Sequence, residues 1–162
     1  CRVPFTAGFM IGLCANGAYK CYAVELVDVH LKWKLRQDKR VLVKEKTHAR
    51  VLTNHIISDL LDAIVCDASF ISLNKVLPSG LKLLKNNGWL AALIKPQFEV
   101  GKGLVGKGGV VRNSELHKEV KNDIKNWLQF EMKMNLRGIV DSPILGPSGN
   151  KEFIIVATKL LN

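Results

Sequence analysis

Short apolar runs bounded by turn-forming residues constrain the fold of this chain most strongly. AIVCD ends with Asp67, WLAALIK ends with Lys95, and EFIIVATKLL begins with Glu152. Runs of about 4 to 8 apolar residues are typical of buried strands in an α/β sheet. If the first two strands are parallel and the third is antiparallel, the three charged residues reach the same edge of the sheet. Open α/β sheets bind ligands at that edge, so the sequence predicts a site with two carboxylates and an ammonium group.

Predicted strands alternate with predicted helices along almost the whole chain, which favours a doubly wound α/β fold. We expect helices over 54–61, with Asn54 as N-cap, over 73–84, and from Asn113 onwards. The glycine-rich segment 99–113 is predicted to be a mobile loop beside Lys95, placed to act as a lid or substrate arm. No repeat or linker is visible, so residues 1–162 are predicted to form a single domain.

The charge of the chain points to a polyanionic partner. Its 24 Lys and Arg residues against 14 Asp and Glu residues give a net charge of +10. Such an excess raises the affinity for polyanions, of which nucleic acid is the commonest. The alternative is an otherwise ordinary enzyme that happens to be basic.

The cysteine pattern argues against a metal site. Cys1, Cys14, Cys21 and Cys66 form no C-x-x-C pair and have no zinc-ligand spacing with the histidines. We therefore expect a reducing compartment and no structural metal. The uncharged stretch 5–19 is interrupted by glycines and too short to span a bilayer. It is predicted to be a helix packed on a sheet, which implies no membrane partner.

Several longer motifs resemble one known family. They are CDASFISL (66–73), IKPQFEVGKGLVGKGGVVR (94–112) and SPILGPSGNKEF (142–153), with WKLR (33–36) and THAR (47–50) between the predicted early elements. In this order and at these intervals they resemble the TlyA, or haemolysin A, branch of the FtsJ-like RNA methyltransferases. The resemblance covers essentially the whole chain.

The resemblance implies a Rossmann-like, S-adenosylmethionine-dependent methyltransferase fold, with a mostly parallel sheet and an antiparallel last strand. It also implies methylation of a ribose 2′-hydroxyl in ribosomal RNA, and hence a cytoplasmic protein. The family's catalytic set is Lys-Asp-Lys-Glu, and its last three members match Asp67, Lys95 and Glu152. Lys95 would accept the hydroxyl proton or stabilise the alkoxide, Asp67 would orient Lys95, and Glu152 would brace the lysine or the ribose. The alternative for Asp67 and Lys95 is a structural salt bridge.

The resemblance also implies a binding site for S-adenosylmethionine. The family's glycine-rich cofactor loop matches Pro4–Met10, where Thr6, Gly8 and Phe9 fit the pattern. Glu25, at the end of the second predicted strand, matches the acidic residue that accepts the ribose hydroxyls of the cofactor. Thr47 and His48 would flank the adenine, and Asp67 would lie near the sulfonium.

The chain departs from the family near its start. Pro4 removes an N–H group and Phe5 adds bulk in the matched loop. Most of the first strand, the first catalytic Lys and the small RNA-binding domain that precedes them are missing, so the chain is N-terminally truncated relative to the family. The alternative function is therefore a degenerate relative that binds RNA or a protein partner without catalysis. Membrane lysis, suggested only by the older family name, has no support in the sequence.

Three basic residues follow the proposed catalytic lysine closely. They are Lys102, Lys107 and Arg112, all on the glycine-rich segment. Because they flank the proposed site, we predict that they contact RNA phosphates.

Overall fold

The computed structural model describes residues 5–24 and 33–161. The chain divides into two compact units, Cys1–Asp59 and Leu60–Asn162. Each unit has its own sheet. The single domain predicted over 1–162 stays a prediction, and the two units are considered separately.

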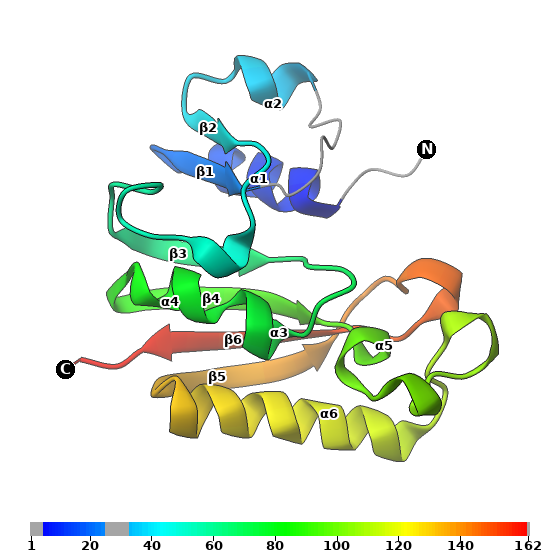
Figure 1. The fold of residues 1–162 in the computed structure, drawn as a ribbon. Helices are drawn as coiled ribbons and strands as arrows, with labels where there is room; N and C mark the ends of the chain where they lie inside the picture. Colours follow the sequence, from blue (N-terminus) through cyan, green and yellow to red (C-terminus); the bar gives the residue numbers. More distant parts are fainter. Residues whose placement is uncertain (1–4, 25–32, 162) are drawn as a thin grey trace. The chain divides into compact units, whose positions relative to one another are not determined.

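Within its described residues, the first unit contains a two-stranded parallel sheet and two α-helices (Figure 1). Helix α1 spans Phe5–Ala15, and α2 spans Trp33–Gln37. Strands β1 (Cys21–Val24) and β2 (Val41–Lys44) pair in register over their whole length. The uncharged stretch at the start therefore forms a helix, as predicted. Its buried residues pack in one core with residues of β1, α2 and β2: Met10, Cys14, Cys21, Ala23, Leu35 and Val41.

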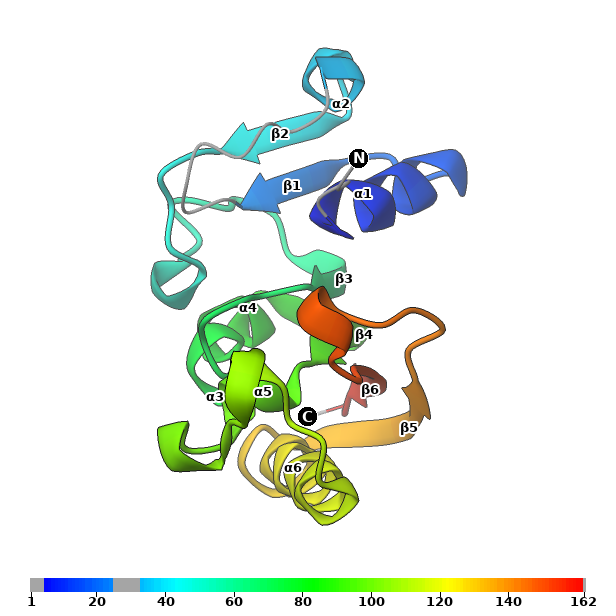
Figure 2. The same ribbon diagram turned by 90° about the vertical axis from the view of Figure 1, so that its right-hand side faces the viewer.

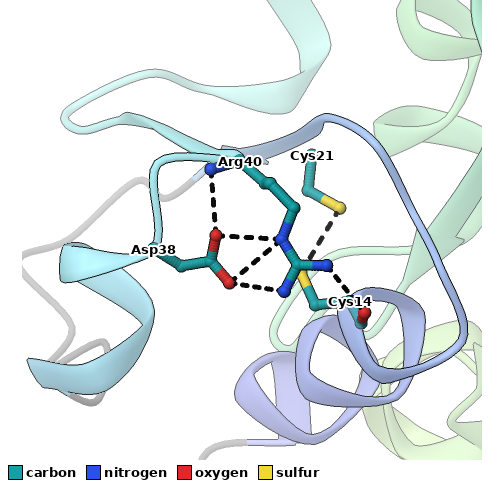
Figure 3. A network of polar contacts seen from close by, with 4 residues as sticks. All are labelled: Cys14, Cys21, Asp38 and Arg40. Carbon is teal, nitrogen blue, oxygen red and sulfur yellow. Dashed lines mark hydrogen bonds and ion pairs between the residues drawn. The ribbon is translucent and has the colours of Figure 1, made fainter.

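Arg40 links the end of α1 to the turn before β2 (Figure 3). Its guanidinium donates to both carboxylate oxygens of Asp38 and, at 2.9 Å, to the backbone oxygen of Cys14. The thiols of Cys14 and Cys21 lie 3.8 Å apart beside it, and both are free. Burial, followed by the Cys14 contact, raises the pKa of Cys21 to about 11. This thiol therefore stays protonated at neutral pH.

The helix predicted over 54–61 is wrong. Here the backbone makes a single turn, in which the Thr53 oxygen accepts hydrogen bonds from the N–H groups of Ile56 and Ile57. Tyr22 donates to the carboxylate of Asp59 at 2.7 Å, which ties the end of this segment to β1. Leu61 then enters a strand, so tertiary contacts override the local helical pattern.

The second unit contains a four-stranded sheet with the order β3-β4-β6-β5. The strands are β3 (Leu61–Cys66), β4 (Leu84–Ile94), β5 (Met134–Asp141) and β6 (Phe153–Lys159). Strands β3 and β4 are parallel, whereas β6 is antiparallel to both β4 and β5. The antiparallel last strand is therefore confirmed.

The prediction of a single, mostly parallel sheet needs correction, because the described strands form two sheets and the larger one is mixed. In the larger sheet β6 lies between two strands of the opposite direction, so two of its three pairings are antiparallel. The resemblance places the end of a further first strand at the start of the chain. Those residues, 1–4, lie outside the described ranges.

The helices of the second unit connect its strands. The α-helices are α3 (Leu73–Val76), α4 (Pro78–Lys82), α5 (Pro96–Glu99) and α6 (Ser114–Asn126), and a π-helical turn, Trp127–Glu131, follows α6. In Figure 2, α3, α4 and α6 lie to one side of the strands. The single helix predicted over 73–84 is broken at Pro78, which has no N–H to donate, and Leu84 already belongs to β4. The predicted cap of α6 is confirmed, because the Asn113 side chain accepts from the Glu115 N–H.

The core of the second unit centres on β4 and β6. Leu90, Ile94 and Ile155 are completely buried there. Of the helices in 5–24 and 33–161, none has the length and apolar character needed to cross a bilayer. Because β4 and β6 are the inner strands, the polar residues at their ends are attached to the most central strands of the sheet.

Candidate active site

Strand direction brings the three charged residues to one edge of the larger sheet. Asp67 follows β3, Lys95 follows the parallel strand β4, and Glu152 precedes the antiparallel strand β6. The register pairs Ile94 with Phe153, so Lys95 and Glu152 flank a paired position. The Lys95 Nζ and Asp67 Oδ1 atoms are 2.5 Å apart. The predicted convergence of the three residues is confirmed, and their catalytic role stays a prediction.

Lys95 and Asp67 form a buried ion pair. Their side chains are only 9% and 6% exposed, and Lys95 Nζ also donates to Ser69 Oγ at 3.1 Å. A buried ion pair adds little to stability, because the loss of hydration offsets most of the attraction. The pair therefore contributes little to the stability of the fold. Its effect is to fix the position of the Lys95 ammonium group at the end of β4.

Glu152 is the third member and is 4% exposed. Burial raises the pKa of its carboxyl, Lys95 lowers this pKa, and Asp67 raises it further; the net shift is upward. The Gln97 side chain hydrogen-bonds to the carboxylate. Within the described part of the chain, Glu152 Oε1 has no hydrogen-bond donor. The site therefore contains a buried acceptor oxygen near the Lys95–Asp67 pair.

Two short segments, one after β3 and one after β4, are joined to each other close to Asp67 and Lys95. The residues that join them were not predicted from the sequence. Glu99 accepts hydrogen bonds from the Ser72 hydroxyl and from the Leu73 N–H, the latter at 3.0 Å. It therefore ties the segment after Lys95 to the segment after Asp67. Burial raises the pKa of Glu99, and these two hydrogen bonds lower it in part, leaving a net upward shift. In the sequence, only the positions of Ser72 and Glu99 indicate this role. Ser72 lies a few residues after Asp67, and Glu99 lies a few residues after Lys95.

Phe70 presents an aromatic face next to Asp67 and Ser69. The residue is 90% exposed and has a φ of 65°, a backbone conformation that is strained for an aromatic residue. Its ring packs against that of Phe98 with the centroids 5.0 Å apart. A strained and exposed phenylalanine is typical of a surface that receives a ligand.

Part of the glycine-rich segment, which was predicted to be a mobile loop, is held by hydrogen bonds. The Asn150 side chain accepts from the Val111 N–H at 3.1 Å and donates to the Gly109 oxygen at 2.9 Å. His117 contacts the Val111 oxygen at 2.8 Å, and Val110 is buried. Buried polar groups hold the part from Gly109 to Val111 in this structure, and the mobile lid stays a prediction.

The segment also contains the three residues predicted to bind RNA. Lys107 lies in the short 3₁₀ turn Lys107–Gly109, and Arg112 lies just before α6; both are exposed. The backbone of Lys102 begins the 3₁₀ turn Lys102–Leu104. Figure 1 shows that the segments after β4 and β5 gather at the same end of the sheet.

The predicted cofactor residues of the first unit are only partly described. Thr6, Gly8 and Phe9 lie in the first turns of α1, so the expected loop at Pro4–Met10 is helical from Phe5 on. Bulkier residues stand here in place of the family's glycines, and they favour a helix. Glu25 lies outside the described residues.

Thr47 and His48 follow β2, at the carboxyl end of the parallel pair. Thr47 Oγ1 donates to the Glu45 oxygen at 3.0 Å, and His48 Nδ1 accepts from the Arg50 N–H at 3.2 Å. Both side chains therefore have a local structural role.

Comparison with known proteins places the chain in a family. A sequence profile described as FtsJ-like methyltransferase matches residues 5–159. The 16S/23S rRNA (cytidine-2′-O)-methyltransferase TlyA of Mycobacterium tuberculosis is 41% identical over 150 residues, which cover 93% of this chain and 56% of the relative. Hemolysin A of Brachyspira hyodysenteriae is 38% identical over 151 residues, covering 92% and 62%. The chain thus spans little more than half the length of these curated relatives.

Solved structures agree. The crystal structure of a protein assigned as a hemolysin from Lactococcus lactis has a TM-score of 0.90 at 35% identity, covering 95% of this chain and 74% of that chain. N-methyltransferase NodS from Bradyrhizobium japonicum in complex with S-adenosyl-L-homocysteine has a TM-score of 0.61 at 10% identity, covering 94% and 73%, and shows the fold alone. The fold is that of the α/β S-adenosylmethionine-dependent methyltransferases. The chain belongs to the FtsJ-like methyltransferase family, in its TlyA/haemolysin A branch.

Proposed function

We propose that the chain is the catalytic part of an RNA ribose 2′-O-methyltransferase that uses S-adenosylmethionine and acts on ribosomal RNA in the cytoplasm. The observation that carries this proposal is the convergence of Asp67, Lys95 and Glu152 at the carboxyl edge of β3 and β4. The family membership and the activity in the name of the Mycobacterium tuberculosis relative support it.

Several described residues support binding of this cofactor. S-adenosylmethionine carries a sulfonium cation, and the buried carboxylates of Asp67 and Glu152 favour a positive charge near them. In the first unit, β1 and β2 are parallel, and Thr47 and His48 follow the carboxyl end of β2, the edge at which such sheets bind nucleotides. We propose that Thr6, Gly8, Phe9, Glu25, Thr47 and His48 hold the cofactor together with Asp67.

The proposed chemistry uses the polar groups of the second unit. S-adenosylmethionine, when bound, supplies the methyl group that is attacked by the ribose oxygen. Asp67 and Ser69 hold the Lys95 ammonium in place, where it stabilises negative charge developing on that oxygen. Glu152 Oε1 accepts a hydrogen bond from the hydroxyl and then its proton, since a carboxyl with a raised pKa is the better proton acceptor. Holding the two reacting groups in line supplies most of the acceleration.

The neighbouring surface suits RNA. The exposed ring of Phe70 offers a face on which a nucleobase can stack, which is typical of RNA-binding sites. Lys107 and Arg112 are exposed on the segment after Lys95, and together with Lys102 we propose that they contact phosphates. Replacing Phe70 with Ala would then weaken RNA binding and leave cofactor affinity unchanged.

A methyl-transfer assay tests the function. The chain is incubated with radiolabelled S-adenosylmethionine and ribosomal subunits or ribosomal RNA, and mass spectrometry of the nucleosides locates the new methyl group. We expect a 2′-O-methylated nucleoside that is absent with Asp67→Asn. A methyl group found on a base, or equal incorporation by wild type and Asp67→Asn, would contradict the proposal.

A second candidate is RNA binding without catalysis. The helical conformation from Phe5 onwards favours it, because the family binds the cofactor there with a glycine-rich loop. Isothermal titration with S-adenosylmethionine separates the two functions. Saturable heat supports the enzyme, whereas RNA binding with no heat at millimolar cofactor supports the binding module.

A further inference from the structure

The turn before β6 contains a glycine whose backbone does not require glycine. Gly146 has φ −73° and ψ −175°, which any residue adopts easily. The requirement at this position is therefore one of space and not of conformation.

The space beside Gly146 is occupied by the carboxylate of Glu152. A Cβ atom built on Gly146 would lie 3.1 Å from Cγ of Glu152, 2.6 Å from Cδ, and closer still to Oε1. Non-bonded carbon atoms pack best at about 3.5–4.0 Å, so a separation of 2.6 Å is a steric clash. Any side chain at position 146 would consequently displace the carboxylate or the turn.

The turn itself is held in place. The Gly146 N–H donates to the Asn150 oxygen at 2.8 Å, and the Gly146 oxygen accepts from the Gly149 N–H at 3.1 Å. Asn150 is 3% exposed, and its side chain bonds to backbone groups at Val111, Gly109 and Pro147. A Cβ at position 146 would therefore move Glu152 more readily than it would move the turn.

The position of Glu152 is defined from two sides. Gln97 contacts the carboxylate through a hydrogen bond, and Gly146 lies against Oε1. This leaves Oε1 buried and without a donor among the residues that the structure describes. An acceptor in this state is ready for a hydroxyl that arrives with the substrate.

We propose that Gly146 is a positioning residue: by lacking a side chain it admits the Glu152 carboxylate to the place from which Oε1 accepts a hydrogen bond from the ribose hydroxyl. This inference rests on the proposed function for the role of the hydroxyl. The contact between Gly146 and Glu152 stands independently of that function.

A double-mutant cycle in activity tests the role. We expect Gly146→Ala to lower kcat by about 10²-fold while the KM for RNA and the affinity for the cofactor stay within a few-fold. Glu152→Asp has a shorter side chain and leaves room for the added methyl group. In that background, Gly146→Ala should therefore cost less than about threefold. The control is Gly138→Ala, because a Cβ there would have no atom within 4 Å.

Two results would overturn the proposal. One is a kcat for Gly146→Ala within twofold of wild type. The other is the same fold-loss from Gly146→Ala in both backgrounds, which would assign the loss to the turn and not to the carboxylate.

A second cycle measures stability and does not depend on activity. In the chain that keeps Glu152, we expect Gly146→Ala to lower the melting temperature by about 4 °C or more. In the chain that carries Glu152→Ala, we expect Gly146→Ala to lower the melting temperature by no more than Gly138→Ala does. Equal losses in both backgrounds would refute the contact. If the wild-type chain transfers no methyl group while this stability coupling is present, the proposed function fails and the contact between Gly146 and Glu152 is retained.

Discussion

The ammonium of Lys95 lies between an acidic side chain and a hydroxyl at the end of β4, an inner strand of the second unit. Asp67 and Ser69 fix its direction, and burial removes the water that would otherwise weaken its field. A charged group held in this way needs no rearrangement when negative charge develops beside it. Among the lysines whose side chains the structure describes, Lys95 is the buried one.

Lys95→Ala should abolish methyl transfer, with a loss of about 10²-fold or more in kcat, and leave the affinity for S-adenosylmethionine within a few-fold. Radiolabel incorporation and isothermal titration measure the two effects. The matched control is Lys85→Ala, on the other end of β4, where an exposed pair with Asp62 contributes little. Near-normal turnover of Lys95→Ala would refute its assignment.

Glu152 should make the stability of the protein depend on pH. Its folded-state pKa is raised above the ordinary value of 4.5, so the folded chain binds this proton more tightly than the unfolded chain does. Its contribution is therefore fully favourable below that value, and the free energy of unfolding falls as the pH rises through the raised pKa. Glu152→Gln removes this dependence.

Urea unfolding of wild type and Glu152→Gln at several pH values measures the effect. We expect Glu152→Gln to gain stability relative to wild type as the pH rises from below the ordinary carboxyl pKa of 4.5 through the raised pKa of Glu152. A difference between the two proteins that stays constant over this range would contradict the shift.

At the scale of elements, prediction from sequence succeeded where local chemistry decides and failed where packing does. The cap at Asn113 and the strands that end just before Asp67 and Lys95 follow from residue pattern alone. The helix expected over 54–61 is a turn, because Asp59 is held by Tyr22 from a distant part of the sequence. The contact of Gly146 with Glu152 and the Asn150 bonds to the glycine-rich segment join residues through tertiary structure, and no local pattern signals them.

Asn113→Ala should lower the free energy of unfolding by about 1 kcal/mol, since the Glu115 N–H loses its hydrogen-bond acceptor. Chemical denaturation provides the value. Asn122→Ala, exposed within the same helix, is the control and should be neutral or slightly stabilising. Equal effects of the two substitutions would show that the cap contributes nothing.

At the scale of the whole molecule, the net charge of +10 favours association with RNA at low salt. The proposed interface places Lys102 and Lys107 on the segment after Lys95, at the carboxyl edge of β4. Lys82 and Lys133 precede β4 and β5, so they lie at the opposite edge of the same sheet. The two pairs of lysines carry the same charge in different places.

Charge reversal of Lys102 and Lys107 to Glu should weaken RNA binding and make its salt dependence less steep. The same reversal of Lys82 and Lys133 changes the net charge equally and should have a much smaller effect. Filter binding over a series of salt concentrations measures both. Equal losses of affinity in the two double variants would mean that only the total charge matters, and the interface would be refuted.

Strand β6 lies between β4 and β5 but is synthesised after both of them. While the ribosome is still translating the turn before it, β4 and β5 have no partner on the sides that β6 will occupy, and Glu152 is not yet beside Lys95. The nascent second unit therefore passes through a stage with two open strand edges, which chaperones recognise and other chains can join. Asp67, Lys95 and Glu152 therefore come together only after β6 has joined the sheet between β4 and β5.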